Sequence, residues 1–460
     1  MKNKTETKNI RQLFGTNGIR GLVNKDLTPE FATTIATSIG NFFKKRKILL
    51  GYDGRTSNTM IASAITAGLL STGCDVYDVG LVSTPCIQLA VKQHDMDGGI
   101  MITASHNPPE YNGIKVIAKD GVEIPRRDEL KIEKNFNQGT LKRADWTGIG
   151  QRYQLRNTLH EYKEAVKNHI NITTIKEKHY HIATDSANGV SSLIVPQLLR
   201  ELGCKVTTLN ADIDGTFPSR PPEPRPENLQ DLATTVQATG ADFGVAFDGD
   251  ADRSIFVDEK GRIQWGDRTF ALVEKDFLQE NPGEKVVTPV SSSQVIKDIA
   301  EKHDGKLIWT KVGSTIVSRT MKKLKAKLGG EENGGVFYGP HQPVRDGAMT
   351  TALILNIMTK SNKKLSELLD SLPLYQLEKD KTRCPHNQKA RVLKELTDEV
   401  KHLKPQTIDG LKLYFPDQSS ILIRPSGTEP IYRLYAEAKT KKRATDLVRE
   451  YKSKLQNFIR

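Results

Sequence analysis

The sequence has no apolar run long enough to cross a membrane. A helix that spans a bilayer needs about 20 predominantly apolar residues, and no stretch of the chain approaches this. The first residues (MKNKTETKN) are polar and lack the apolar segment of a signal peptide. We therefore expect no membrane association and a cytoplasmic location.

Cysteine is also scarce, and its few copies lie far apart. No C-x-x-C pair occurs among the four cysteines, which are Cys74, Cys86, Cys204 and Cys384. This spacing argues against a disulfide framework and against a thiolate zinc site. A reducing compartment fits such usage.

Acidic residues are outnumbered by basic ones, 55 to 68, which gives a formal net charge of +13. Such an excess favours either nucleic acid or a small anionic substrate. The basic runs are short, at 44–47, 322–327 and 441–443, and no RNA-binding signature or DNA-reading motif accompanies them. We interpret them as solvated surface and expect no nucleic-acid partner.

A strand–helix–strand pattern recurs three times, at 47–80, 179–210 and 284–312. Each copy is typical of two parallel strands joined by a right-handed crossover. The last part differs, because a helix over 388–402 precedes three strands and a final helix over 441–458. We predict three related α/β domains with mixed sheets, followed by an α+β domain with an antiparallel sheet. The predicted boundaries are 1–153, 154–258, 259–373 and 374–460.

Three carboxylates alternate with small residues in DFGVAFDGDADR (242–253). Asp248, Asp250 and Asp252 follow an apolar strand, and the residues between them permit a tight turn. Three hard oxygen ligands without His or Cys select Mg²⁺, Mn²⁺ or Ca²⁺ over zinc. A solvated acidic turn is the alternative, but three like charges repel unless a cation or Arg253 compensates them.

A serine follows the apolar strand of GGIMITASHNPPEYNGIK (98–115). Ser105 is expected at the carboxyl end of that strand, where open α/β sheets place their ligands. An isolated serine in a strand-to-helix turn is most often a helix cap. His106 and Lys115 supply titratable and cationic groups nearby, so a nucleophile or a phosphorylation site is the stronger interpretation.

Two arginines bracket the turn in SSILIRPSGTEPIYRLYAEA (419–438). Two guanidiniums, two hydroxyls and an exposed glycine backbone suit a phosphate dianion. Two weaker signals accompany this one. Carboxylate and amide groups on the glycine-rich loop LGGEENGGVFYG (328–339) suit sugar hydroxyls or an amino group, and Arg20 in FGTNGIRG (14–21) suits a phosphate.

Taken in this order, the five segments resemble the α-D-phosphohexomutase superfamily over essentially the whole chain. TASHNP, DGDADR and RPSGTEP carry the resemblance, and FPSRPPEPRPENL (217–229) and TKVGS (310–314) are similar to further family segments. The resemblance implies an isomerase that moves a phosphoryl group between two hydroxyls of a phosphosugar. Ser105 would be the phosphoserine, and its phosphate would complete a single Mg²⁺ shell with Asp248, Asp250 and Asp252.

The resemblance also assigns the other residues. Arg20 and Arg253 would steady the metal centre, and Lys115 and His106 are both candidates for the general acid and base. Glu331 and Asn333 would contact the sugar ring. The residues that would hold the non-reacting phosphate are Arg424, Ser426, Gly427, Thr428 and Arg433. A bisphosphorylated sugar would be the intermediate and activator, with one phosphate held while the other returns to Ser105.

The GEENGG form of the 330–335 loop resembles archaeal members of the superfamily that act on glucosamine phosphate, and its Asn333 is shared with acetylglucosamine phosphate mutases. The favoured reaction is therefore glucosamine 6-phosphate to glucosamine 1-phosphate, with a glucose or mannose phosphomutase as the alternative. Gly335 stands where many bacterial relatives carry His. A regulatory protein in which Ser105 is phosphorylated by a kinase is the competing class, and a monomer or a homodimer is expected.

Overall fold

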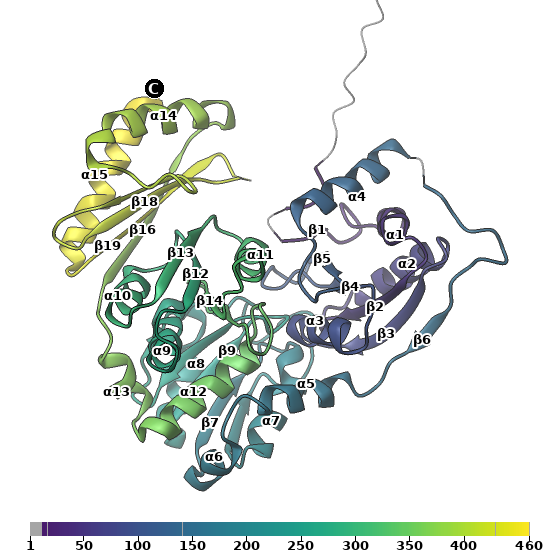
Figure 1. Cartoon of the computed structure of the whole chain (residues 1–460), viewed down its shortest axis with the longest axis horizontal. Coiled ribbons are helices and arrows are strands. Elements are labelled where there is room, and N and C mark those ends of the chain that lie inside the picture. The colour runs from purple at the N-terminus through teal and green to yellow at the C-terminus, as the bar shows by residue number, and fades with distance from the viewer. Residues whose placement is uncertain (1–11, 16, 140, 428, 460) are drawn as a thin grey trace, which may run out of the picture. The chain divides into compact units, whose positions relative to one another are not determined.

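A computed structural model describes residues 12–15, 17–139, 141–427 and 429–459 (Figure 1). The chain forms two compact units. One contains the residues up to Gln264 together with Pro340–Asn362, and the other contains Trp265–Gly339 together with Lys363 onward. None of the helices in the described ranges has the length and apolar character that crossing a membrane requires.

The first unit begins with a six-stranded mixed sheet of order β1-β5-β4-β2-β3-β6. Its strands are β1 (Ile19–Leu22), β2 (Lys47–Tyr52), β3 (Asp75–Leu81), β4 (Gly98–Ile102), β5 (Tyr111–Ala118) and β6 (Arg152–Gln154). Strand β2 pairs in parallel with β3 and β4, whereas β5 is antiparallel to β4 and β1. The apolar run of β2 is buried, as expected for a strand in the middle of a covered sheet.

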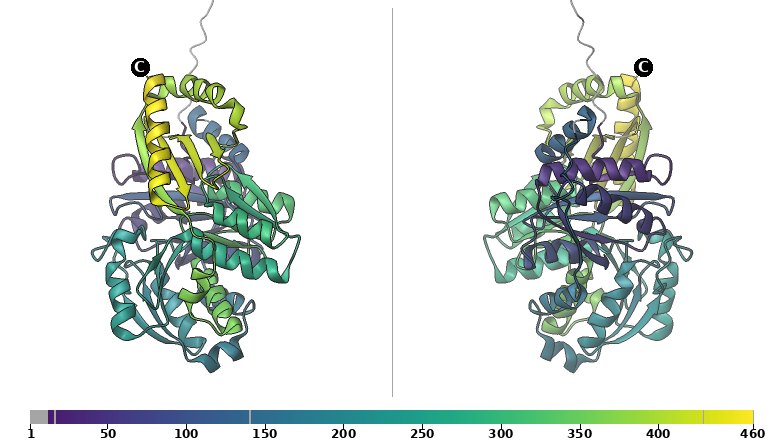
Figure 2. Two further views of the ribbon diagram at one scale, coloured as in Figure 1. Left: turned by 90° about the vertical axis from the view of Figure 1, so that its left-hand side faces the viewer. Right: turned by 90° about the vertical axis from the view of Figure 1, so that its right-hand side faces the viewer.

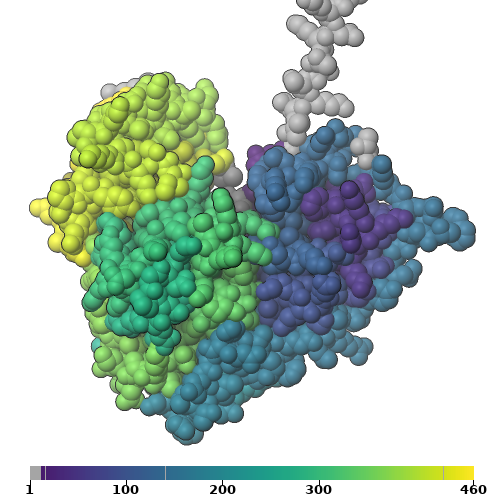
Figure 3. Space-filling view, in the orientation of Figure 1, coloured from purple at the N-terminus to yellow at the C-terminus, as the bar shows by residue number. Residues whose placement is uncertain are grey.

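Helices α1 (Pro29–Phe43), α2 (Asn58–Leu70), α3 (Thr84–Gln93) and α4 (Arg126–Gln138) accompany this sheet. Figure 1 shows α1 and α2 lying side by side, and the two helices contact each other extensively. Helix α1 begins where Thr28 accepts a hydrogen bond from the Phe31 amide and Pro29 occupies the first turn. The segment 141–151 that leads into β6 lies on the surface (Figure 3).

A second mixed sheet in the same unit has the order β11-β10-β9-β7-β8. Its strands are β7 (His181–Asp185), β8 (Lys205–Leu209), β9 (Phe243–Phe247), β10 (Ser254–Asp258) and β11 (Ile263–Gln264). The accompanying helices are α5 (Thr158–Lys167), α6 (Ile172–Lys178), η1 (Val190–Leu193), α7 (Val195–Glu201), η2 (Pro226–Asn228) and α8 (Gln230–Thr239). The single helix expected over 189–204 is divided into η1 and α7, because Pro196 lacks an amide hydrogen and is accommodated only at the start of α7.

The second unit contains a four-stranded mixed sheet of order β13-β12-β14-β15. Its strands are β12 (Lys285–Pro289), β13 (Lys306–Thr310), β14 (Leu328–Gly330) and β15 (Val336–Tyr338), with helices α9 (Gly266–Glu280), α10 (Gln294–Lys302), α11 (Ser314–Leu324) and α13 (Leu365–Asp370). Helix α12 (Gly347–Ser361), which lies between α11 and α13 in the sequence, belongs to the first unit. It packs there against β10, α5 and α6.

The last sheet is antiparallel throughout, with the order β16-β19-β18-β17. It consists of β16 (Gln376–Arg383), β17 (Leu411–Tyr414), β18 (Ser420–Pro425) and β19 (Ile431–Ala438), with η3 (His386–Gln388), α14 (Lys389–Glu399), η4 (Lys401–Leu403) and α15 (Lys441–Ile459). Figure 2 shows α15 lying across one face of this sheet, which it contacts at β16 and β19. Strand β16 was not predicted, because an edge strand of sequence QLEKDKTR has no apolar alternation.

The predicted fold class is confirmed, with three α/β domains that have mixed sheets and a C-terminal domain with an antiparallel sheet. All three predicted β-helix-β units contain parallel strand pairs, β2 with β3, β7 with β8 and β12 with β13. The domain boundaries stay predictions.

Candidate active site

Three aspartates lie in the loop between β9 and β10. The two strands are antiparallel and pair Phe247 with Ser254, so the residues between them form the connection. Asp248, Asp250 and Asp252 are all buried, and one carboxylate oxygen from each lies within 4.8 Å of the others. Ala251 adopts a left-handed conformation (φ 59°), which a small side chain between two of the carboxylates tolerates.

The donor set of this loop fits a hard divalent cation. The Oδ1 atoms of Asp250 and Asp252 are buried and have no hydrogen-bond partner among the residues that the structure describes. Burial, and then the charges of Asp252 and Asp250, raise the pKa of Asp248 well above its usual range. A cation among three carboxylates would satisfy the unpaired oxygens and remove the repulsion, and oxygen ligands alone select Mg²⁺, Mn²⁺ or Ca²⁺.

Ser105 lies directly against this loop. Its Oγ donates a hydrogen bond of 2.7 Å to Oδ2 of Asp248 and lies 3.3 Å from Nδ1 of His106. The residue is fully buried and adopts a left-handed conformation (φ 52°), which is strained for a side chain other than glycine or asparagine. The turn connects β4 to the antiparallel strand β5, so the helix-cap interpretation is wrong: no helix begins there.

Arg55 holds the serine turn in this conformation. Its guanidinium donates to the carbonyls of Ser105 (3.0 Å), Asn107 (2.6 Å), Pro108 (2.7 Å) and Tyr111 (2.8 Å). Arg55 also pairs at 3.3 Å with Asp53, which in turn accepts a hydrogen bond from Thr103 at 2.6 Å. Arg55 and Asp53 are buried, so this network ties the end of β2 to the serine turn.

Lys115 reaches the acidic loop from β5. Its Nζ lies 2.7 Å from Asp250 and 3.4 Å from Asp252. Burial by itself would lower the pKa of Lys115, but these two carboxylates outweigh it and raise that pKa. Thr84, at the start of α3, donates a 2.6 Å hydrogen bond to the same Oδ2 of Asp250.

A second cation, Arg345, approaches the loop from the segment that precedes α12. Its Nη2 lies 2.5 Å from Oδ2 of Asp252, and the side chain is buried. The amide of Gly347 donates to the carbonyl of Ala251 at 3.2 Å. Asp346 caps α12 and accepts a 2.5 Å hydrogen bond from the hydroxyl of Tyr162 on α5. The start of α12 is thereby attached to the acidic loop and to α5.

Three further basic groups surround the serine. Arg20 donates to the side-chain oxygen of Asn107, and burial followed by repulsion from Arg253 lowers the pKa of Arg20 to about 10. The amide of Arg253 donates to Asp248 at 3.1 Å, and its Nε lies 3.8 Å from Asp252. Burial, then Arg253 and Arg20, lower the pKa of His106 well below its usual range.

All the residues predicted around the phosphoserine and the metal therefore lie together in the first unit. Sequence reasoning missed Arg55, Thr84 and Arg345. Arg55 directly follows the strand–turn KILLGYDG, and that position at a strand end was the available signal. Arg345 lies almost 100 residues from Asp252, and no local pattern connects the two.

The second unit contains the predicted phosphate loop between β18 and β19. Arg424 and Arg433 are direct partners in the antiparallel ladder, so their side chains share one face of the sheet. Arg424 pairs with Asp409 at 2.7 Å and Arg433 with Glu429 at 2.5 Å. Thr428 lies outside the described residues.

The predicted sugar loop is the hairpin turn between β14 and β15. Glu331 is buried, and the Asn333 side chain accepts a hydrogen bond from the Gly335 amide at 3.3 Å. A Cβ on Gly330 would lie 2.3 Å from the Phe270 ring, which explains one of the glycines. Glu332, the neighbour of Glu331, pairs at 2.8 Å with Lys379 of β16.

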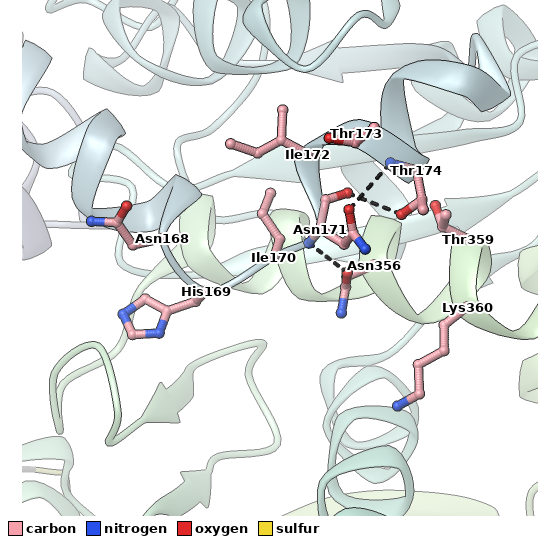
Figure 4. A pocket seen from close by; sticks show the side chains of 10 residues that line it. All are labelled: Asn168, His169, Ile170, Asn171, Ile172, Thr173, Thr174, Asn356, Thr359 and Lys360. Atoms are coloured by element: carbon pink, nitrogen blue, oxygen red, sulfur yellow. Dashed lines mark hydrogen bonds between the residues drawn. The ribbon is translucent and has the colours of Figure 1, made fainter.

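A separate open hollow in the first unit shares no residue with the acidic loop (Figure 4). Asn171, which caps α6, accepts there from the Thr174 amide at 3.2 Å, and the Asn171 amide donates to Asn356 of α12 at 3.1 Å. These asparagines join α6 to α12, so their side chains have a structural role.

Comparison with known proteins gives matches along nearly the whole chain. Family models match at 11–143, 160–261, 265–375 and 381–453. They describe α/β/α domains I, II and III and the C-terminal domain of phosphoglucomutase/phosphomannomutase.

Individual relatives agree with these models. A phosphoglucomutase/phosphomannomutase of Thermococcus kodakarensis is 46% identical, covering 95% of this chain and 96% of the relative. A phosphoglucosamine/phosphogalactosamine mutase of Sulfurisphaera tokodaii is 43% identical, and the match covers 96% of this chain and 98% of the relative. The crystal structure of a Burkholderia thailandensis phosphoglucomutase/phosphomannomutase family protein has a TM-score of 0.87 at 28% identity, covering 96% and 97%. The chain therefore belongs to the phosphoglucomutase/phosphomannomutase family of the α-D-phosphohexomutase superfamily, and it is an isomerase of the phosphotransferase class.

Proposed function

We propose that the chain is a phosphoglucosamine mutase, which interconverts glucosamine 6-phosphate and glucosamine 1-phosphate through a phosphoserine at Ser105. The observation that carries the proposal is the 2.7 Å hydrogen bond between Ser105 Oγ and Asp248, at the edge of a three-carboxylate cluster. The relative from Sulfurisphaera tokodaii is named a phosphoglucosamine/phosphogalactosamine mutase, which supports an amino-sugar phosphate as the substrate. The Thermococcus kodakarensis relative, named a phosphoglucomutase/phosphomannomutase, favours the alternative, a glucose or mannose phosphomutase of mixed specificity.

Asp248, Asp250 and Asp252 would hold one Mg²⁺ together with the phosphate on Ser105. When bound, the cation would withdraw electron density from that phosphate and neutralise its charge. Arg20 and Arg253 would contribute positive charge beside it.

In the proposed reaction a sugar hydroxyl oxygen attacks phosphorus and the bond from phosphorus to Ser105 Oγ breaks. The hydroxyl proton passes to a general base, Ser105 Oγ takes up a proton from the general acid as it leaves phosphorus, and a bisphosphorylated sugar forms. Reversal with the other phosphate returns a phosphoryl group to Ser105. His106, 3.3 Å from Oγ, and Lys115, held by Asp250, are both candidates for the proton transfers.

Recognition of the substrate is proposed for residues of the second unit. Glu331 and Asn333 would contact the sugar ring. The residues proposed to bind the non-reacting phosphate are Arg424, Ser426, Gly427, Thr428 and Arg433. Each guanidinium already has a carboxylate partner, so phosphate would compete with Asp409 and Glu429 for them.

The phosphoserine is tested by Ser105→Ala. We expect turnover to fall by at least about 10³-fold, since a covalent step is lost. Intact mass spectrometry of wild-type protein incubated with a hexose bisphosphate should show one added phosphoryl group, which Ser105→Ala lacks. Ser63→Ala, on the exposed face of α2, is the control. Full turnover by Ser105→Ala would reject the mechanism and favour a regulatory phosphorylation.

The substrate is tested by kcat/KM on the 6-phosphates of glucosamine, acetylglucosamine, glucose and mannose. We expect glucosamine 6-phosphate to exceed the others by about tenfold or more, which corresponds to about 1.4 kcal/mol in the transition state. Equal values for all four would reject the preferred substrate and leave a mutase of mixed specificity.

A further inference from the structure

The turn that joins β18 to β19 is closed at its base by the main chain. The Ser426 amide donates to the carbonyl of Ile431 at 2.9 Å, and the Glu429 amide donates to Ser426 Oγ at 3.1 Å. Between these bonds, two carbonyls of the turn accept from a side chain elsewhere in the sequence. Lys389 Nζ donates to the carbonyl of Ser426 at 2.5 Å and to that of Glu429 at 2.6 Å.

Lys389 is held firmly in this position. It is the first residue of α14, its side chain is buried, and its own carbonyl accepts a 2.6 Å hydrogen bond from the hydroxyl of Tyr432. Tyr432 is fully buried in β19, next to Arg433. Within the described ranges no carboxylate lies within ion-pair distance of the Lys389 ammonium, whose other neighbour is Nδ1 of His386 at 3.3 Å. A buried ammonium surrounded by carbonyl dipoles and an imidazole nitrogen leaves a net positive charge beneath the turn.

The direction of these bonds determines where the next amide points. In a planar trans peptide the C=O of one residue and the N–H of the following residue point in opposite directions. Because the Ser426 carbonyl points inward to Lys389, the Gly427 N–H points away from it. A Cβ on Gly427 would meet nothing within 4 Å, so the turn has open space beside this residue.

We propose that Lys389 is a positioning residue of the phosphate-binding turn. It orients the Gly427 N–H outward toward a phosphate. It also adds a positive charge that attracts the phosphate electrostatically without direct contact. The inference rests on the proposed function in one respect, the assignment of this turn to the non-reacting phosphate. It adds a residue on α14 to that site.

The test is a calorimetric titration of the full chain with inorganic phosphate, together with steady-state kinetics on glucosamine 6-phosphate. For Lys389→Met we expect the Kd for phosphate and the KM for the sugar phosphate to rise about tenfold or more, whereas kcat changes by less than about threefold. Lys389→Gln keeps a donor but loses the charge, and Lys389→Arg keeps both, so Arg should recover most of the affinity.

Lys394→Met is the matched control, because it removes the same charge from an exposed position on the same helix. A thermal melt establishes that each variant is folded. If Lys389→Met does not fold, the phosphate affinities of Lys389→Gln and Lys389→Arg are compared instead, and they test the same proposal. Unchanged phosphate affinity in a folded Lys389 variant, an equal loss in Lys394→Met, or no phosphate binding by the wild type would each overturn the proposal. Normal phosphate binding without mutase turnover would instead reject the proposed function.

Discussion

At the scale of single residues, the negative charges of the acidic loop are partly neutralised by cationic side chains from distant parts of the chain. Three buried carboxylates face Lys115 from β5 and Arg345 from the segment before α12. All of these groups are desolvated, so the electrostatic interactions between their charges are stronger than they would be in water. Cation binding and turnover should therefore respond differently to the same substitution.

Arg345→Gln tests this balance. Removing the guanidinium leaves the loop one unit more negative, so we expect Mg²⁺ or Mn²⁺ to bind tighter by roughly three- to tenfold because a competing positive charge is absent. Turnover should fall by about 10²-fold, since Asp252 loses the group that orients it. Calorimetry with Mg²⁺ and electron paramagnetic resonance with Mn²⁺ measure the affinity directly.

Arg345→Lys, which keeps the charge, should show near-normal cation affinity with part of the turnover. General damage to the loop would weaken cation binding in Arg345→Gln, and that result would contradict the charge argument.

At the scale of elements, helix α9 contains a buried carboxyl group whose loss of hydration is not offset by hydrogen bonds. Glu274 is fully buried in this helix, and in the described part of the chain neither carboxylate oxygen has a hydrogen-bond partner. Burial raises the pKa of Glu274 well above its usual range. The folded state therefore holds this proton more tightly than the unfolded state does, and the stability of the fold falls as pH rises between the unfolded and the folded pKa.

Glu274→Met should stabilise the protein at neutral pH. The substitution replaces an unsatisfied buried group with an apolar one of similar size, so we expect a gain on the order of 1–3 kcal/mol at pH 7.5. The gain should shrink as pH falls toward the unfolded pKa of about 4.3, because the wild-type carboxyl is protonated in the folded state and becomes increasingly protonated in the unfolded state. Urea denaturation from pH 4.5 to 8 measures it.

Glu280→Gln, at the exposed end of α9, should show no such pH dependence. A Glu274→Met variant that is less stable than wild type at every pH would mean that the carboxylate has a favourable role in the fold.

At the scale of the whole molecule, the two compact units contain different proposed ligand sites. The acidic loop belongs to the first unit, and the turn between β18 and β19 belongs to the second. A ligand that binds a folded unit stabilises that unit by mass action. The two ligands should therefore act on separate unfolding transitions.

Differential scanning calorimetry should resolve two transitions. We expect Mg²⁺ at about 100 times its Kd to stabilise one of them by about 2.7 kcal/mol and inorganic phosphate at a similar excess to stabilise the other. In Asp250→Asn the Mg²⁺ shift should disappear while the phosphate shift persists. A single transition whose calorimetric and van't Hoff enthalpies agree would show instead that the units unfold as one cooperative body.

What the sequence alone determined is local. Apolar runs predicted β2, β7 and β12. Carboxylates or a hydroxyl shortly after a strand predicted the acidic loop and Ser105, because open α/β sheets place their ligands at the carboxyl ends of strands. Strand β16 was not predicted, because the polar pattern of this edge strand has no apolar periodicity.

Only the tertiary structure decided which distant groups meet. Arg345 reaches Asp252, and Lys389 holds the turn at Ser426. Ser105 contacts Asp248 across 143 positions, a meeting that the family resemblance implied but that no local pattern indicates. These contacts depend on how strands are ordered in each sheet and on which unit α12 packs against. Both are set by the burial of apolar surface over the whole fold, which no short stretch of sequence encodes.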